Sequence, residues 1–268
     1  SDPLDRSGRD LPDNEIILDI NAPLGTNNLL TSEGASLENP DNTHFAPGTL
    51  ARNIFARGNS TPTTIVNQDA RNTDGIGLNG TTLDASGNGT NGGNILLLGG
   101  GSEIGRGIRV INSAIQTSDS GNIRLIGLGG LGTDNIIGKD TSDNTQGIRI
   151  DGLLTTPSTI SSENGDIQLT GYAAGSGGTD VGTWLATSGV EVSSSRNGDI
   201  NIIGISDSTT NFNNEGVAVS SGAIVEANGS GNINLSGIGG LGTRSNTNPG
   251  IHISLVGTGS GSRFYAKN

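Results

Sequence analysis

The sequence has no cysteine and no methionine, and aromatic residues make up only 3 % of its 268 positions. Without cysteine the fold can contain no disulfide, and thiol chemistry is excluded. A chain without either sulfur residue tolerates an oxidising exterior. Hydrophobic residues amount to 31 %, which is too few for a compact core of large side chains.

Long apolar runs and positive charge are also scarce. No apolar stretch approaches the ~20 residues of a membrane-spanning helix, so membrane insertion is not expected. The 14 Lys and Arg residues face 26 Asp and Glu residues, and the resulting net charge of −12 argues against a nucleic-acid partner. The first residues, SDPLDRSGRD, include no initiator methionine and no signal peptide. We therefore expect a processed chain or a piece of a longer one.

Glycine is abundant, with 46 residues, and much of it belongs to an internal repeat. Residues 121–133 read GNIRLIGLGGLGT, and residues 231–243 read GNINLSGIGGLGT. Their opening phrase, Gly-[Asn/Asp]-Ile-x-[Leu/Ile]-x-Gly, begins at residues 93, 121, 165, 198 and 231. Constant phrases at unequal spacing indicate constant strands that are joined by loops of variable length.

Two further phrases recur between these copies. The second phrase is GIGL (75–78), GIRV (107–110), GIRI (147–150), GTWL (182–185), GVAV (216–219) and GIHI (250–253). The third phrase is TLDAS (82–86), AIQTS (114–118), TISSE (159–163), VEVSS (190–194) and AIVEA (223–227). Apolar and polar residues alternate in all three phrases, which indicates β-strands with one buried face.

Three short strands per repeat, always in the same order, predict an all-β fold: a single right-handed parallel β-helix of about seven turns, ~35 Å long. The Asn or Asp of the first phrase is expected to form a hydrogen-bonded ladder. The repeats are expected to span 71–257. An irregular N-terminal cap, lead-in segment or donor-strand segment (1–70), with strands at 15–20 and 64–66, is expected to precede them. A C-terminal cap or tail (258–268) is expected to follow. One inward column is expected to hold the core residues Ile95, Ile123, Ile167, Ile200 and Ile233.

The phrases GNIRLIGLGGLGT, GIRI and TISSENGDIQLTG resemble repeats of filamentous-haemagglutinin-like secreted proteins of Gram-negative bacteria. Many of those proteins are adhesins exported by two-partner secretion. The resemblance covers roughly residues 71–257, and it implies a right-handed β-helix with the role of an extracellular fibre or adhesin. No secretion domain is recognisable at the N-terminus, which leaves the export route open.

These observations predict a structural protein without enzymatic activity or cofactor, acting as a subunit or segment of a bacterial surface fibre, sheath or adhesin. Its irregular ends suggest end-to-end self-association through the termini of the β-helix. The alternative is a discrete glycan-binding adhesin module, in which Arg109, Arg149, Trp184 and His252 form an outward platform for a carbohydrate or an anion. Against this platform stands a simpler interpretation, in which Trp184 packs under its own loop and the arginines keep the protein soluble.

A third possibility is a polysaccharide-cleaving enzyme, because Asn72-Thr73-Asp74-Gly75 resembles the NTDG motif of polygalacturonase-like β-helices. Those enzymes also need an Asp-Asp pair and a Gly-His-Gly. The chain has no Asp-Asp dipeptide, and neither His44 nor His252 lies in such a context. The segment is therefore expected to form a turn.

Calcium binding has weak candidates in Asp134, Asp166 and Asp199. Residues 129–137, GGLGTDNII, fit a calcium-binding nonapeptide, but such sites need tandem copies. The sister segment has Arg244 where the carboxylate should be. We therefore expect a glycine corner at Asp134 and solvated carboxylates at Asp166 and Asp199, with no bound metal.

Overall fold

The fold is described from a computed structural model of the whole chain. For four strands near the N-terminus, at residues 15–21, 29–31, 36–38 and 53–59, only the backbone is described. All regular structure in the described residues is β-strand, which confirms the all-β fold class. Side chains are described for residues 74–86, 92–101, 105–130, 145–175, 179–207, 214–241, 248–254 and 262–266.

The described strands form three parallel sheets of seven strands each. The first sheet consists of β1 (Glu15–Asn21), β4 (Asn53–Asn59), β7 (Ile95–Gly100), β10 (Ile123–Leu128), β13 (Ile167–Ala173), β16 (Ile200–Ser206) and β19 (Ile233–Ile238). The second sheet consists of β2 (Leu29–Thr31), β5 (Ile76–Asn79), β8 (Ile108–Ile111), β11 (Gln146–Asp151), β14 (Val181–Leu185), β17 (Val217–Val219) and β20 (Ile251–Ile253). The third sheet consists of β3 (Ser36–Glu38), β6 (Thr82–Asp84), β9 (Ala114–Gln116), β12 (Ser158–Ser162), β15 (Val190–Ser194), β18 (Ile224–Ala227) and β21 (Arg263–Ala266).

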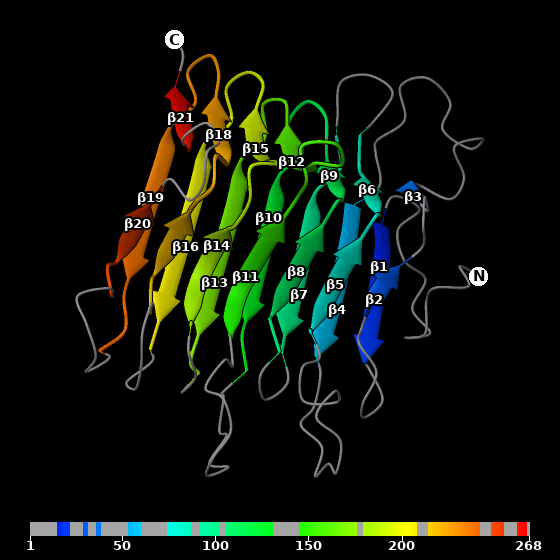
Figure 1. Cartoon of the computed structure of the whole chain (residues 1–268). Coiled ribbons are helices and arrows are strands. Elements are labelled where there is room, and N and C mark those ends of the chain that lie inside the picture. Colours follow the sequence, from blue (N-terminus) through cyan, green and yellow to red (C-terminus); the bar gives the residue numbers. More distant parts are fainter. Residues whose placement is uncertain are drawn as a thin grey trace, which may run out of the picture.

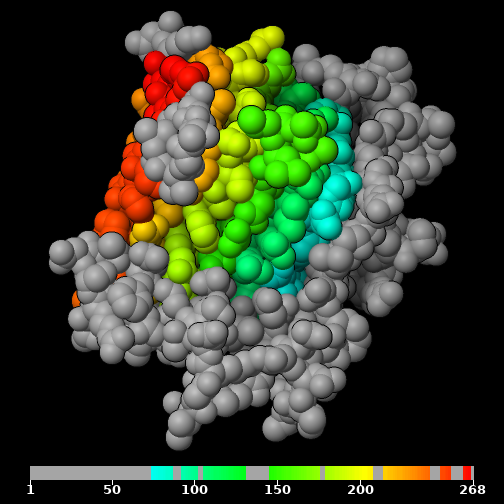
Figure 2. Space-filling view, in the orientation of Figure 1, coloured from blue at the N-terminus to red at the C-terminus, as the bar shows by residue number. Residues whose placement is uncertain are grey.

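The three sheets are wound together as a parallel β-helix with three strands per turn. Along the chain, each strand of the first sheet is followed by one of the second and one of the third, and this order recurs seven times. In Figure 1 the turns follow one another from the blue first turn to the red last turn, and Figure 2 shows the described turns as bands of colour in the same order. The predicted coil of about seven turns is confirmed.

Aliphatic residues stack in columns inside the coil. Ile167 pairs with Ile123 on one side and with Ile200 on the other. Ile95 extends this column toward the first turn, and Ile233 extends it into the last turn. The first four of these isoleucines are at most 1 % exposed, whereas Ile233 is partly buried and packs against the same core. The predicted core column is therefore confirmed.

The Asn and Asp side chains beside this column form the expected ladder. In each step the side-chain Oδ1 of one turn accepts a hydrogen bond from the backbone N–H of the next turn, at N···O distances of 2.7 to 2.9 Å. The ladder requires an acceptor oxygen, which both Asn and Asp provide, so the two residue types interchange along it. Its members are Asn94, Asn122, Asp166, Asp199 and Asn232.

The recurrent glycines mark the corner where the first sheet leads into the second. A Cβ on Gly127, at the end of the first phrase, would lie 2.0 Å from the carbonyl oxygen of Gly147. A Cβ on Gly147, which opens the second phrase, would lie 2.1 Å from the backbone nitrogen of Tyr172 in the following turn. Backbone segments approach one another too closely for any side chain at this corner, and this explains why both phrases keep a glycine there.

The coil extends beyond the boundaries expected from the sequence at both ends. β1, β2 and β3 form its first turn and β4 begins the second, so the segment 1–70 already contains strands of the coil. The strand expected at 15–20 is present, and the one expected at 64–66 lies outside the described residues. β21, within the expected tail, completes the last turn. Residues 71 and 257 therefore do not mark the ends of the coil.

Candidate functional site

The candidate ligand platform lies on the outer face of the second sheet. Strand pairing places Arg109 opposite Arg149, and Arg149 opposite Trp184, in three successive turns. Ala218 and then His252 continue the same column in the next two turns. The four residues of the expected platform thus share one outward column, but Ala218 separates His252 from the other three.

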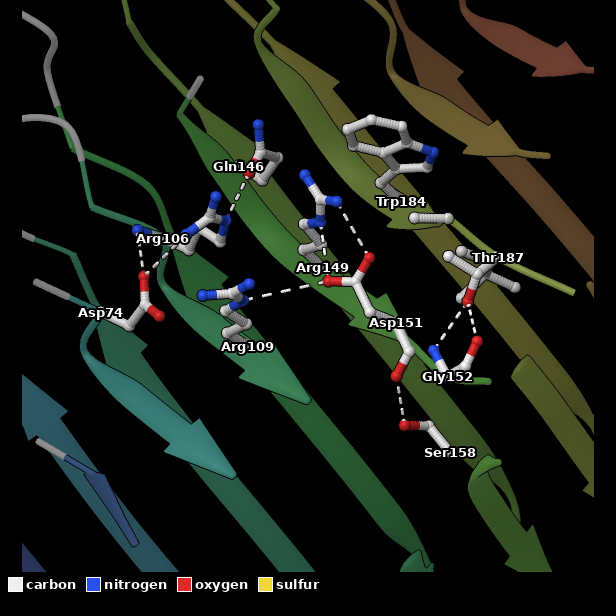
Figure 3. A network of polar contacts seen from close by, with 12 residues as sticks. Asp74, Arg106, Arg109, Gln146, Arg149, Asp151, Gly152, Ser158, Trp184 and Thr187 are labelled. Carbon is white, nitrogen blue, oxygen red and sulfur yellow. Dashed lines mark hydrogen bonds and ion pairs between the residues drawn. The ribbon is translucent and has the colours of Figure 1, made fainter. Parts of the chain in front are cut away.

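Arg149 is held at the centre of this column by Asp151, which lies on the same strand, β11. The Nε of Arg149 donates to Oδ2 of Asp151 at 2.8 Å, and its Nη2 donates to Oδ1 at 2.9 Å. The guanidinium carbon of Arg149 lies 4.5 Å from the ring centre of Trp184, and Figure 3 shows the two side chains next to each other. In this geometry Arg149 makes a bidentate hydrogen-bonded contact with a carboxylate and a cation–π contact at the same time.

A second, more buried arginine extends the network toward the N-terminal turns. Arg106 donates from Nε to Oε1 of Gln146 at 2.7 Å, and its Nη1 lies 3.5 Å from Oδ1 of Asp74 (Figure 3). Burial lowers the pKa of Arg106, and the charge of Asp74 opposes this shift. The positive charges of Arg109 and Arg149 lower the pKa of Arg106 further. The three arginines are therefore close enough to influence one another electrostatically.

Arg109 has the least complete pairing of the three arginines. Its Nε lies 3.9 Å from Oδ2 of Asp151, which is too long for a hydrogen bond, and this buried atom has no hydrogen-bond partner among the described residues. The Arg109 side chain is 35 % exposed, compared with 21 % for Arg149. One carboxylate, that of Asp151, thus faces two arginines, and it accepts hydrogen bonds from Arg149.

Trp184 packs toward the turn that follows it. Its Nε1 donates a hydrogen bond to Oγ of Ser220 at 3.0 Å. Ala218 follows Trp184 in the outward column but is only 3 % exposed, so larger neighbours cover it. Arg149 stacks on the ring from the preceding turn. These contacts support packing as the main role of Trp184, although the side chain remains partly exposed.

His252 belongs to a separate contact at the last turn. Its Nδ1 lies 2.5 Å from Oε1 of Glu215, which lies just before β17. Burial raises the pKa of Glu215, while the hydrogen bond and charge of His252 act in the opposite direction. The structure therefore places His252 apart from the arginine and tryptophan contacts.

The described calcium candidates are part of the Asn/Asp ladder. Asp134 lies outside the described residues. Asp166 and Asp199 are neighbours in the Asn/Asp ladder, where the Oδ1 of each accepts a backbone hydrogen bond from the next turn. Among the residues with described side chains, no three His, Cys, Asp or Glu residues are grouped so that they could hold a metal ion.

The network includes residues that the strand phrases do not reveal. Asp74, Arg106 and Gln146 directly precede the glycines of GIGL, GIRV and GIRI. A polar residue immediately before the second phrase, present in four of its six copies, is therefore the signal that could have found them. Asp151, which follows GIRI, has no equivalent acid in the other repeats, and only the structure shows that it pairs with Arg149.

Chemically, the site is a set of guanidinium donors balanced incompletely by two carboxylates. Asp74 and Asp151 are both engaged by arginines, so neither is placed as a free general acid or base. Arg109 and the exposed part of Trp184 are the groups that remain for an outside molecule. An anionic group such as a sugar carboxylate or a sulfate is the ligand that such donors suit.

Comparisons of the chain with models of known protein families, with curated proteins and with solved structures find no match. Among the residues that the structure describes, no helix is long and apolar enough to cross a membrane. The fold and the site therefore rest on the sequence and structure of this chain.

Proposed function

We propose that the chain is a structural extracellular protein, a subunit or segment of a bacterial surface fibre, sheath or adhesin. The observation that supports this most directly is the continuous stack of seven turns. Every interior strand hydrogen-bonds to a strand on each side, and the inward columns are aliphatic in nearly every described turn, with Thr183 between Ile148 and Val217 as an exception. Bending or stretching such a rod strains many backbone hydrogen bonds together, and this is the physical basis of its stiffness.

The charge and composition of the chain fit the same role. The net charge of −12 keeps such molecules apart in solution along their sides. The absence of cysteine and methionine suits an oxidising exterior, and the resemblance of the repeat phrases to filamentous-haemagglutinin-like proteins supports secretion. In this proposal the partners are further copies of the chain at its ends and surface glycans along its sides, with neither nucleic acid nor membrane insertion involved.

Surface labelling tests this role. Antibodies raised against the 268-residue chain are applied to intact cells of the organism that produces it and are located by immunogold electron microscopy. We expect label along fibres or a sheath without permeabilisation. Label that requires permeabilised cells would contradict an extracellular role.

The stack of Arg149 on Trp184, with the incompletely paired Arg109 beside it, favours glycan binding as a second candidate function. A glycan array tests it with the wild type, Trp184→Ala and Arg109→Ala. Gln168→Ala is the control, because Gln168 lies on the outer side of a different sheet. Reproducible hits that only the first two substitutions abolish support recognition, and an array without hits leaves the structural role alone.

The proposal includes no enzymatic activity. Asp74, the described residue of the NTDG segment, accepts hydrogen bonds from Arg106 and is only 7 % exposed. Incubation with pectin or alginate, followed by a reducing-end assay, is therefore expected to release nothing. Reducing ends above those of a heat-denatured control would overturn this part.

A further inference from the structure

We propose that the last turn of the coil binds the first turn of a second copy of the chain, in the register of the coil itself, so that molecules associate head to tail. This inference rests on the proposed structural function and specifies its interface. The last turn consists of β19, β20 and β21, and the first turn consists of β1, β2 and β3.

The last turn exposes core columns that are buried in the preceding turns whose side chains are described. In β20, Ile251 is 39 % exposed and Ile253 is 50 % exposed. Their partners in the preceding turn, Val217 and Val219, are both 0 % exposed. Ile233 is likewise only partly buried, whereas its partner in the preceding turn is fully buried. These residues form an apolar end face for which a further turn is the natural cover.

The end face also carries unused strand edges. In the strand order of the described sheets, β19, β20 and β21 are each terminal. The Asn/Asp ladder reaches its last described member, Asn232, in the same turn. In every earlier step an oxygen of this ladder receives the backbone N–H of a following turn, so one more turn in register would extend the pattern. An added strand at each of three edges is association by β-sheet extension.

The first turn carries the residue types that this register requires. Pairing through the sheets assigns Ile16 and Leu18 of β1 to the columns that end in Ile233 and Leu235. Leu30 of β2 belongs to the column that ends in Ile253. In the third sheet, the column of Leu37 ends in Phe264. Stacking one coil on the next therefore continues each of these columns with an apolar residue.

Charge favours contact between the last turn of one copy and the first turn of another over contact between two last turns. Residues 1–38 contain eight acidic and two basic residues, a net charge of −6. Residues 227–268 contain Arg244, Arg263 and Lys267 and no acid, a net charge of +3. Two last turns brought together would repel, whereas a last turn and a first turn attract each other. The complementarity stands out because the whole chain has a net charge of −12.

One ion pair can be assigned from the register. The outward column of Arg263 begins at Ser36, and the neighbouring outward column of Tyr265 begins at Glu38. In a stacked pair, Arg263 of one molecule and Glu38 of the next would occupy diagonal positions on one sheet face, about 8 Å apart at the backbone, given a strand spacing of ~4.8 Å and a rise of ~3.3 Å per residue. This distance is within reach of an arginine and a glutamate side chain.

Sedimentation velocity of the full chain tests the interface with two end-blocking variants. Ile253→Asp places a charge on the last turn, and Leu30→Asp places one on the first. The wild type is expected to form oligomers that grow beyond dimers as its concentration rises, because a head-to-tail contact does not close. Each variant alone is expected to stay monomeric. An equal mixture of the two is expected to give a heterodimer, since one intact end of each kind remains.

Three results overturn the interface: wild type that is monomeric at all concentrations, Leu30→Asp that dimerises alone, or a mixture that stays monomeric. Far-UV circular dichroism shows whether the aspartate variants fold. If either does not, Arg263→Glu and Glu38→Lys replace them. Each of these is expected to weaken association about fivefold and their mixture to restore it, and unchanged association of both refutes the charge pairing. Surface labelling is independent of these outcomes, so loss of the interface leaves the proposed structural function separately testable.

Discussion

Removing one isoleucine from the core column is the most direct test of the stacked architecture. Ile167 is 0 % exposed and pairs with Ile123 and Ile200 in the turns on either side. Ile167→Ala deletes three carbon atoms, which at ~0.8 kcal/mol per buried CH₂ amounts to about 2.4 kcal/mol of lost transfer free energy. Neighbouring turns are fixed by backbone hydrogen bonds and cannot close the cavity, so we expect a total loss of about 3–4 kcal/mol in the free energy of unfolding.

The same substitution in the last turn is expected to cost much less. Ile251 is 39 % exposed, so about 60 % of its surface contributes, and the space left behind opens to solvent. Ile251→Ala should therefore lower the free energy of unfolding by about 1.5 kcal/mol or less. Gln168→Ala, one residue after Ile167 on the outer side of the same strand, is the matched control and should stay within about 0.5 kcal/mol of the wild type.

Urea unfolding followed by two probes measures these differences. Trp184 is the only tryptophan and reports on the turn that contains Ile167, whereas far-UV circular dichroism reports on all turns. A shift of the urea midpoint at constant slope isolates the change in stability. A cost below about 1 kcal/mol for Ile167→Ala, or equal costs for Ile167→Ala and Ile251→Ala, would refute the reasoning that burial in a rigid stack sets the magnitude.

Three further predictions follow from single contacts. Gly127→Ala places a Cβ 2.0 Å from the carbonyl oxygen of Gly147, so it should lower the free energy of unfolding by more than about 2 kcal/mol. The control Gly80→Ala, at a residue with φ +62° and open space around it, should lower this free energy by about 1 kcal/mol. Equal urea midpoints for the two variants would contradict the close approach at Gly127. Asp199→Ala removes the acceptor of the Asn232 backbone N–H and should cost about 0.5–1 kcal/mol, while Asp199→Asn keeps the acceptor and should be near neutral; the reverse order of melting temperatures would refute the ladder. Because burial raises the pKa of Glu215, the contribution of this group to stability is complete below its ordinary value of about 4.3 and is lost as the pH rises through the raised pKa. Glu215→Gln should therefore gain stability relative to the wild type as the pH rises above about 4.3, and a melting-temperature difference that is constant or moves the other way counts against this assignment.

The strands and the core could be predicted from the sequence because both depend on repetition along the chain. Alternation identifies the inward residues of each strand, and recurrence of the phrase identifies which residues lie above one another. Ile123, Ile167 and Ile200 are brought together from separations of 33 residues or more by these two patterns alone. The Asn/Asp ladder was predictable for the same reason.

The early turns were not recognised because their sequences depart from the phrase. Residues 52–58, RNIFARG, supply β4, and their pairing aligns Ile54 with Ile95 and Gly58 with Gly99. Arg52 occupies the place of the opening glycine, and Ala56 occupies the place of the inward leucine. In a stack of parallel strands, backbone hydrogen bonds from a neighbouring turn stabilise a strand whose sequence departs from the phrase. The alternation of apolar and polar residues along that strand does not reveal this stabilisation.

The polar network was beyond sequence reasoning for a different reason. Arg106 donates a hydrogen bond to Gln146, forty residues away, and Arg149 rather than Arg109 donates the two hydrogen bonds that Asp151 accepts. Both Arg109 and Arg149 stand at the same place in GIRV and GIRI, so the pattern treats them alike. Their difference arises because Asp151 lies on the strand of Arg149 and one turn beyond Arg109.

The inward columns, which repeat similar residues, and the outward column of the second sheet, which varies, therefore serve different parts of the proposed function. Most inward positions keep aliphatic residues because each must fill the same narrow space, and in the proposed function they stiffen the rod. The outward column of the second sheet changes its residue in nearly every turn, from Gly77 through the two arginines and Trp184 to His252. Within this column Ala218 is buried and Trp184 packs on its neighbours, whereas the Arg109 side chain is 35 % exposed, so the position of Arg109 can serve recognition at little cost to the stack. A substitution such as Arg109→Ala should thus alter ligand binding while the urea midpoint stays nearly unchanged, and that separation distinguishes a recognition column from a structural one.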